Sequence, residues 1–197
     1  GDGGITKVYT ANTPFTFPVG CFSTNRPATY AYTPAEIGFS SSPTSYGSLT
    51  IIPVGYEYPA TTVKNQSLTF FWRIRSTGFT GYAGKVTHSF IYSPADVNGI
   101  VANYIPSLYD LSANTWNNGD FPNINTGTYT ITDWTTPAVS ANFLDDDYTA
   151  GDNTTAGGAF GTPLIFYSIA GTSGAYATWN SNTTWSYTSG GAAVPAG

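Results

Sequence analysis

The amino-acid sequence predicts an all-β protein. Hydrophobic residues make up 41% of the 197 positions, which is enough to form a buried core. Aromatic residues reach 16% and charged residues only 9%, alongside 22 glycines and 13 prolines, a balance typical of short strands joined by turns. Apolar and polar residues alternate along many short segments, and no segment has the period of an amphipathic helix. These features favour an antiparallel β-sandwich of immunoglobulin-like or jelly-roll type, with no significant helix.

The predicted strands are the alternating segments between turn signals: residues 6–10, 15–19, 29–32, 48–54, 67–76, 85–92, 100–105, 128–132 and 164–169. Alternation is clearest in 67–76, whose apolar face contains Leu68, Phe70, Trp72 and Ile74. We expect its other face to meet water; that face contains Thr69, Phe71, Arg73 and Arg75. Segment 85–92 repeats the pattern after a glycine-containing loop, so we expect these two strands to pair as a hairpin.

The chain is predicted to have a main module and a C-terminal segment. A change in composition near residues 151–163, which are rich in Gly, Asn and Thr, indicates a linker or a long loop. We therefore expect residues 1–160 to form the sandwich module. Residues 161–197 are too few to fold alone, so they either complete the sandwich or begin a following module. Met is absent even at position 1, and we expect a processed product or part of a longer chain.

Charge and cysteine content limit the partners and the location. The formal charge is −5, and beyond Lys85 there are eight acidic residues and no Lys or Arg, which argues against nucleic-acid binding. No apolar run approaches the roughly 20 residues of a membrane span. The only cysteine, Cys21, cannot form an internal disulfide and is expected to be a buried apolar residue. A chain rich in Ser, Thr and Asn with so little sulfur suits an extracellular or cell-surface location.

Several stretches resemble a known class of module. These are GDGGITK at the start, LTFFWRIRSTGF followed by VTHSFIY in the middle, DYTAGD, and ATWNSNTTWS near the end. They resemble a β-rich repeat module of very large surface proteins of Bacteroidota, over almost the whole chain. The resemblance implies export by the type IX secretion system and a part in adhesion, gliding or extracellular fibres. It implies no catalytic residues.

An acidic segment, residues 144–152, contains four of the eleven acidic residues of the chain. It does not fit an EF-hand, because Tyr148 and Ala150 occupy ligand positions and Gly157 stands where the closing Glu belongs. A less regular calcium site built from Asp145, Asp147 and Asp152 remains open, since backbone carbonyls can supply further ligands. The favoured alternative is a polar turn whose Asp side chains bind nearby amides.

Two tryptophans, Trp179 and Trp185, lie six residues apart with Asn and Thr between them. Exposed indoles beside amides can form a platform for sugar rings, whereas buried ones would close the edge of a core, which is the favoured role. The only histidine, His88, lies on the apolar face of its segment, where a core position is favoured over catalysis.

Three functions follow. The preferred one is a non-enzymatic structural or adhesive module of a large extracellular surface protein or fibre, whose partners are neighbouring modules or copies of the same protein. The alternative is a carbohydrate-binding domain that uses exposed Trp and Tyr, with calcium as an optional aid. A hydrolase would need two carboxyl groups at a defined separation, and no motif marks such a pair.

Overall fold

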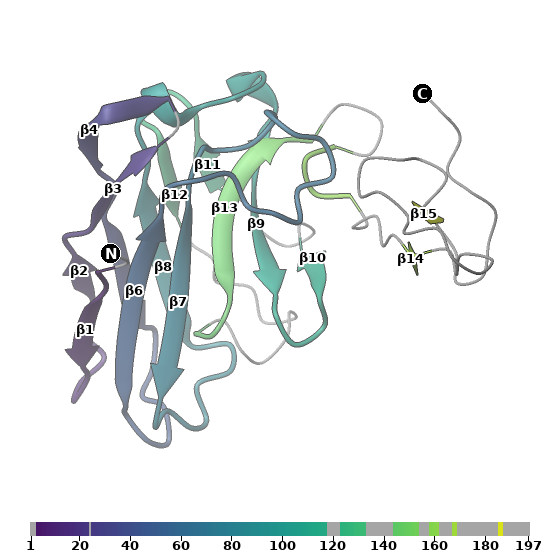
Figure 1. Ribbon diagram of the computed structural model, residues 1–197. Helices are drawn as coiled ribbons and strands as arrows, with labels where there is room; N and C mark the ends of the chain where they lie inside the picture. Colours follow the sequence, from purple (N-terminus) through teal and green to yellow (C-terminus); the bar gives the residue numbers. More distant parts are fainter. Residues whose placement is uncertain are drawn as a thin grey trace. The chain divides into compact units, whose positions relative to one another are not determined.

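The computed structural model describes residues 3–23, 25–117, 123–132, 144–153, 158–161, 167–168 and 185–186. The chain divides into two compact units, Gly1–Thr162 and Pro163–Gly197. Two short strands are described in the second unit, where β14 (Tyr167–Ser168) pairs with β15 (Trp185–Ser186) (Figure 1). The role predicted for residues 161–197 stays a prediction.

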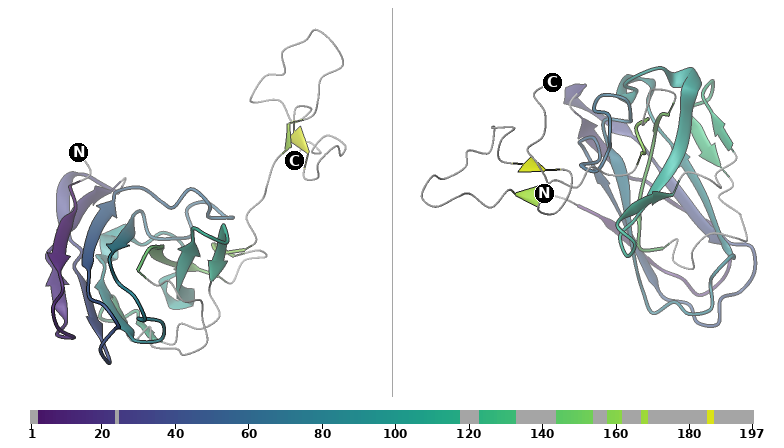
Figure 2. Two further views of the ribbon diagram at one scale, coloured as in Figure 1. Left: turned by 90° about the horizontal axis from the view of Figure 1, so that it is seen from below. Right: turned by 90° about the vertical axis from the view of Figure 1, so that its right-hand side faces the viewer.

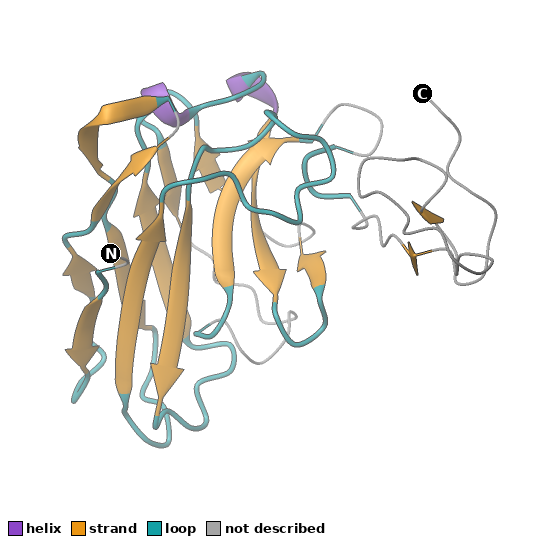
Figure 3. Cartoon of the chain, viewed as in Figure 1, coloured by secondary structure: helices purple, strands orange, loops and turns teal. Residues whose placement is uncertain are grey.

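The first unit is an antiparallel β-sandwich, which confirms the predicted fold class. One sheet has the order β1-β6-β7-β13-β9-β10, from strands Ile5–Val8, Ser48–Val54, Phe71–Thr77, Asp147–Asp152, Tyr104–Asp110 and Thr115–Asn117. The other has the order β11-β12-β8-β5-β2, from strands Asn123–Asn125, Thr130–Thr132, Val86–Ile91, Ala35–Phe39 and Phe15–Phe17. A separate hairpin joins β3 (Gly20–Ser23) to β4 (Arg26–Tyr32). In the described part of the chain, the helices are the three-residue 3₁₀ turns η1 (Pro94–Asp96) and η2 (Val101–Asn103), at the same end of the sandwich as the hairpin (Figure 3).

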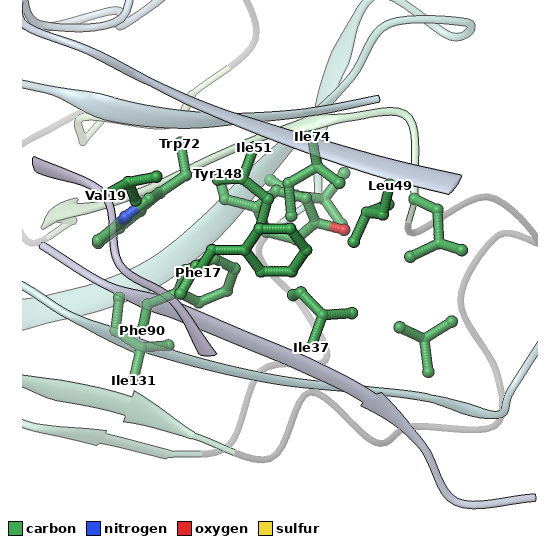
Figure 4. Close-up of a cluster of buried hydrophobic side chains, with 14 of the residues drawn as sticks. Phe17, Val19, Ile37, Leu49, Ile51, Trp72, Ile74, Phe90, Ile131 and Tyr148 are labelled. Carbon is green, nitrogen blue, oxygen red and sulfur yellow. The ribbon is translucent and has the colours of Figure 1, made fainter. Parts of the chain in front are cut away.

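The main core fills the space between the two sheets, which Figure 2 shows along the strand direction. The six-stranded sheet contributes buried side chains that include Leu49, Ile51, Trp72, Ile74 and Tyr148, and the other sheet contributes Phe17, Ile37, Phe90 and Ile131 (Figure 4). These positions alternate along each strand, as the sequence predicts for an inward face. A hydrogen bond also links the two layers: the Trp72 indole N–H donates to the carbonyl of Thr33 at 2.8 Å.

The predicted pairing of segments 67–76 and 85–92 is wrong. β7 pairs with β6 and β13, whereas β8 belongs to the opposite sheet and pairs with β5 and β12. The two strands face each other across the core, where Trp72 and Phe90 have ring centroids 4.7 Å apart. Their matching apolar patterns arise from this facing arrangement, because both strands turn one face to the same core.

The outer face of β7 meets solvent only in part: the side chains of Arg73 and Arg75 are 37% and 35% exposed, as the prediction requires, but Phe71 does not fit it. Phe71 has no exposed surface, and it belongs to a second hydrophobic cluster on the outside of the six-stranded sheet. The cluster also contains Val54, Tyr58, Tyr109, Trp116, Ala159 and Phe160. Loop residues therefore cover the sheet, and this cover is what a period-2 pattern cannot reveal.

Candidate functional site

Most of the acidic segment is a strand in the interior of the protein, so the predicted polar turn is confined to residues 144–146. The amide binding predicted with it is present, since Asp145 and Asp146 accept hydrogen bonds from the backbone N–H groups of Ser76 and Leu111. β13 lies between β7 and β9 in the six-stranded sheet, and all six of its residues are buried. Gly151 allows close packing here, since a Cβ at this position would lie 2.8 Å from the Gln66 carbonyl oxygen and 2.9 Å from the Phe160 ring. The carboxylates of this segment are consequently surrounded by protein.

Asp147 forms a buried ion pair with two arginines of the neighbouring strand. It lies directly opposite Arg73 in the register. Arg75 Nη2 lies 3.0 Å from Asp147 Oδ1, and Arg73 Nε lies 3.3 Å from the same oxygen. Tyr58 packs on Tyr109 with ring centroids 4.9 Å apart. Burial raises the pKa of the Tyr58 phenol, and the negative charge of Asp147 raises it further. Asp147 is thus engaged in holding β7 and β13 together under an aromatic cover.

The two preceding carboxylates have other partners. Asp145 accepts hydrogen bonds from the backbone N–H and the hydroxyl of Ser76, both at 2.7 Å. Asp146 accepts from the Leu111 N–H at 3.2 Å, while its Oδ2 is buried and has no hydrogen-bond partner among the described residues. Burial raises the pKa of the Asp146 carboxyl to about 7, and the charges of Asp110 and Asp145 act in the same direction. Asp146 is therefore the carboxyl of this segment that can take up a proton near neutral pH.

The structure does not bring the three predicted calcium ligands together. Asp147 and Asp152 are the two ends of the six-residue strand β13, so they lie five positions apart and their side chains point to opposite faces. Asp152 accepts a hydrogen bond from the Ile100 N–H at 3.2 Å, far along the strand from the arginine pair of Asp147. Within the described ranges, no group of three or more His, Cys, Asp or Glu side chains is placed to hold a metal ion.

The other residues singled out from the sequence have varied outcomes. His88 is buried in the main core, with Nε2 3.4 Å from the Tyr148 hydroxyl, which confirms its core position. Cys21 is also buried, as predicted. Trp179 lies outside the described residues, and Trp185 is described only as part of β15, so the glycan platform assigned to this pair stays a prediction.

A different aromatic site, which sequence reasoning missed, lies beside the β3–β4 hairpin. A surface cavity of about 380 Å³ is lined by residues from the hairpin and from the end of β6, among them Gly20, Phe22, Tyr30, Pro53, Gly55 and Tyr56. We call it the aromatic cavity. Phe22, Tyr30 and Tyr56 are 39%, 69% and 48% exposed, whereas most aromatic side chains in the two clusters are buried. None of the described residues that line the cavity carries a charge.

Strand geometry explains why these aromatic rings face outward. In β3, Cys21 and Ser23 are buried and Phe22 between them is exposed, because successive side chains point to opposite sides of a strand. The Phe22 and Tyr30 rings are in contact but tilted, with centroids 3.5 Å apart and planes at 37° to each other. Tyr56 packs edge-on against the buried Phe71, at 5.6 Å between centroids. The cavity therefore presents exposed rings, of which Tyr56 is supported by a buried ring and Phe22 and Tyr30 by each other.

Buried polar contacts fix the hairpin against the sandwich. The Ser23 hydroxyl donates to Asp96 Oδ1, which also accepts from the Thr69 hydroxyl at 2.9 Å, and Asp96 is fully buried. Gly55 permits the other close approach, since a Cβ there would lie 2.0 Å from the carbonyl oxygen of Phe22. These contacts join the hairpin to η1 and to the end of β6, which lie at the same end of the sandwich (Figure 1).

Comparison of the chain with models of protein families, with curated proteins and with solved structures found no match. Among the described residues, no helix is both long and apolar enough to cross a membrane.

Proposed function

We propose that this chain is a non-enzymatic structural or adhesive module of a large extracellular surface protein, which makes contacts with neighbouring modules or with a surface. One observation supports this proposal above the others: Asp145 and Asp147, two of the acidic side chains that invite a chemical role, are bonded to structural partners. Asp145 binds Ser76, and Asp147 binds Arg73 and Arg75. The resemblance of the sequence to surface modules of Bacteroidota agrees with it.

The exposed side chains support contact rather than chemistry. Among the residues that the structure describes, the large exposed hydrophobic side chains are spread over the hairpin, the strand ends and the loops: Val8, Phe22, Tyr30, Tyr32, Tyr56, Ile91, Ile100 and Leu111. Phe22, Tyr30 and Tyr56 among them line the aromatic cavity. Tyrosine and phenylalanine offer large contact area with few rotatable bonds, which is why aromatic residues are enriched where proteins bind partners.

Adhesion of the whole chain tests the proposal. Beads coated with the folded chain should be retained on cells of the producing organism, or on a surface coated with the same chain, more strongly than beads coated with the heat-unfolded chain. Turnover of a polysaccharide or ester substrate, lost in folded Asp145→Asn or Asp147→Asn variants, would instead establish a hydrolase.

A further inference from the structure

We propose that the aromatic cavity binds a neutral saccharide, with a pyranose ring on the Phe22–Tyr30 pair and hydroxyl groups directed to the Tyr56 side of the cavity. This inference rests on the proposed adhesive function and deepens it, because it names the chemical class that the module would hold. It places the site on the β3–β4 hairpin of the sandwich, away from the tryptophan pair singled out from the sequence.

The absence of charged side chains among the described lining residues favours an uncharged ligand. The chain as a whole has a formal charge of −5, yet the described residues that line the cavity are aromatic, aliphatic, cysteine or glycine. An ionised group placed here would lose hydration without gaining a partner of opposite charge, which is unfavourable. Anionic sugars, phosphates and charged peptides are thereby disfavoured, and an uncharged molecule with hydrogen-bonding edges is favoured.

The rings of the cavity suit a sugar, which has apolar faces and a polar edge. A pyranose ring has C–H groups on its faces and hydroxyl groups around its edge. The negative face of an aromatic ring attracts polarised C–H groups, and a phenol hydroxyl or a backbone amide can bind the sugar hydroxyls. Tyr30 and Tyr56 each combine an exposed ring with a hydroxyl, and Gly20 and Gly55 contribute backbone to the lining of the cavity.

The size and rigidity of the cavity agree with a short glycan segment. Its volume of about 380 Å³ is near the lower end of the roughly 300–1,000 Å³ typical of small-ligand sites. The hairpin is fixed through Ser23 and Asp96 beneath the ring pair. A site that is already ordered loses little conformational entropy when a ligand binds.

An extended peptide is a weaker candidate for the same surface. Peptides commonly bind β proteins by adding a strand to an exposed edge. The edge strands of the two sheets are β1 with four residues and β2, β10 and β11 with three residues each. Edges this short offer few backbone hydrogen bonds to an added strand. The hairpin has a longer edge strand, β4 with seven residues, but it contains Pro27, which has no backbone N–H to donate.

The test is binding of the full chain to a panel of neutral polysaccharides (glucans, galactans, mannans and xylans), with uronate-containing and sialylated glycans and a proline-rich peptide set as the other arms. We expect a neutral glycan to bind, and Tyr30→Ala and Tyr56→Ala each to weaken binding by about tenfold or more, as for aromatic anchors in other binding sites. Tyr30→Phe should retain most of the affinity, because it keeps the ring.

The matched control is Tyr32→Ala. Tyr32 is 62% exposed and follows Tyr30 by two residues in β4, but it does not line the cavity, so its removal should change affinity by less than about twofold. Binding of anionic glycans or peptides alone, equal losses for Tyr30→Ala and Tyr32→Ala, or no binding by any neutral glycan would each overturn the inference. If the bead adhesion described above persists when no glycan binds, the adhesive function stands without it; if adhesion is also absent, both fail.

Discussion

The acidic segment and the aromatic cavity use their most conspicuous side chains in opposite ways. In the acidic segment, Asp147 is buried and bonded to two arginines, and the partly buried Asp145 is bonded to Ser76. In the cavity, apolar rings that would add to a core are left at the surface. Charged groups stabilise the fold in the first region, whereas hydrophobic area is exposed to solvent in the second. A cluster of acidic residues in a sequence is therefore a weak guide to function when a neighbouring strand supplies arginines.

The largest expected effect comes from the outer face that the sequence predicted to meet water. Phe71→Ala should lower the free energy of unfolding by about 3–5 kcal/mol, because Phe71 is fully buried in the second cluster. Chemical denaturation of the variant and of the parent chain measures the difference. A loss below about 1 kcal/mol would mean that this face is solvated after all.

The next effect concerns Asp146 and pH. Its pKa in the folded protein is about 7, above the ordinary value of 3.8, so the folded state holds a proton that the unfolded state releases between these values. The contribution of Asp146 to the free energy of unfolding is therefore fully present at low pH and is lost as the pH rises from about 4 to about 7. The loss is on the order of 4 kcal/mol at most.

The matched variant is Asp146→Asn, which keeps the acceptor for the Leu111 N–H and cannot ionise. Denaturation from pH 4 to pH 8 should show that the variant gains stability relative to the parent as pH rises. Parallel pH profiles for the two proteins would contradict a raised pKa at Asp146.

Removing the buried carboxylate of Asp147 should lower the free energy of unfolding by an amount similar to, or somewhat smaller than, the pH effect of Asp146. Asp147→Ala leaves Arg73 and Arg75 without their shared partner and should reduce the free energy of unfolding by about 3 kcal/mol, the lower end for buried pairs because both arginines stay partly hydrated. The control is Glu36→Gln at an exposed position, which we expect to change stability by less than about 0.5 kcal/mol. If Asp147→Ala and Glu36→Gln lowered the free energy of unfolding equally, the claim that the buried carboxylate stabilises the fold more than an exposed one would be wrong.

Truncation of the cavity rings should scarcely alter stability. Tyr30→Ala is expected to change the free energy of unfolding by less than about 0.5 kcal/mol, because the side chain is 69% exposed. Thermal melts of this variant beside Phe71→Ala would sharpen the contrast between exposed and buried rings. A large loss for Tyr30→Ala would show that the ring pair is part of the fold rather than of a binding surface.

The smallest expected effect is that of calcium. Since Asp145, Asp147 and Asp152 have separate partners, excess calcium or a chelator should leave the melting temperature unchanged within error. A rise in melting temperature that depends on calcium concentration would require a site that these carboxylates do not form in this arrangement.

Much of the fold was predictable from alternation, and the exceptions have physical causes. Segment 48–54 matches β6, and 15–19 contains β2, because both alternate between polar neighbours. β13 was missed because Asp is depleted from strands, and the arginines that make it acceptable lie far away in the sequence. Pairing of β7 with β8 was misjudged because a glycine-containing loop can join two sheets as well as two neighbouring strands.

The candidate site was less predictable than the fold. Alternation marks Phe22 as opposite to Cys21, but it does not say which side of a hairpin is covered. The cavity also combines the hairpin with the end of β6, and only the folded chain brings Phe22 beside Gly55. A run of Tyr30 and Tyr32 two residues apart was the one available signal, since it places two aromatic residues on the same side of a strand.

The burial of Cys21 has a consequence for chemical durability. The chain has no methionine, and its single thiol lies within the main core. Peroxides act on proteins first through thioethers and exposed thiolates, and neither is offered here. The sandwich should therefore resist sulfur oxidation for as long as it stays folded, a property of value to any domain that must last without repair enzymes around it.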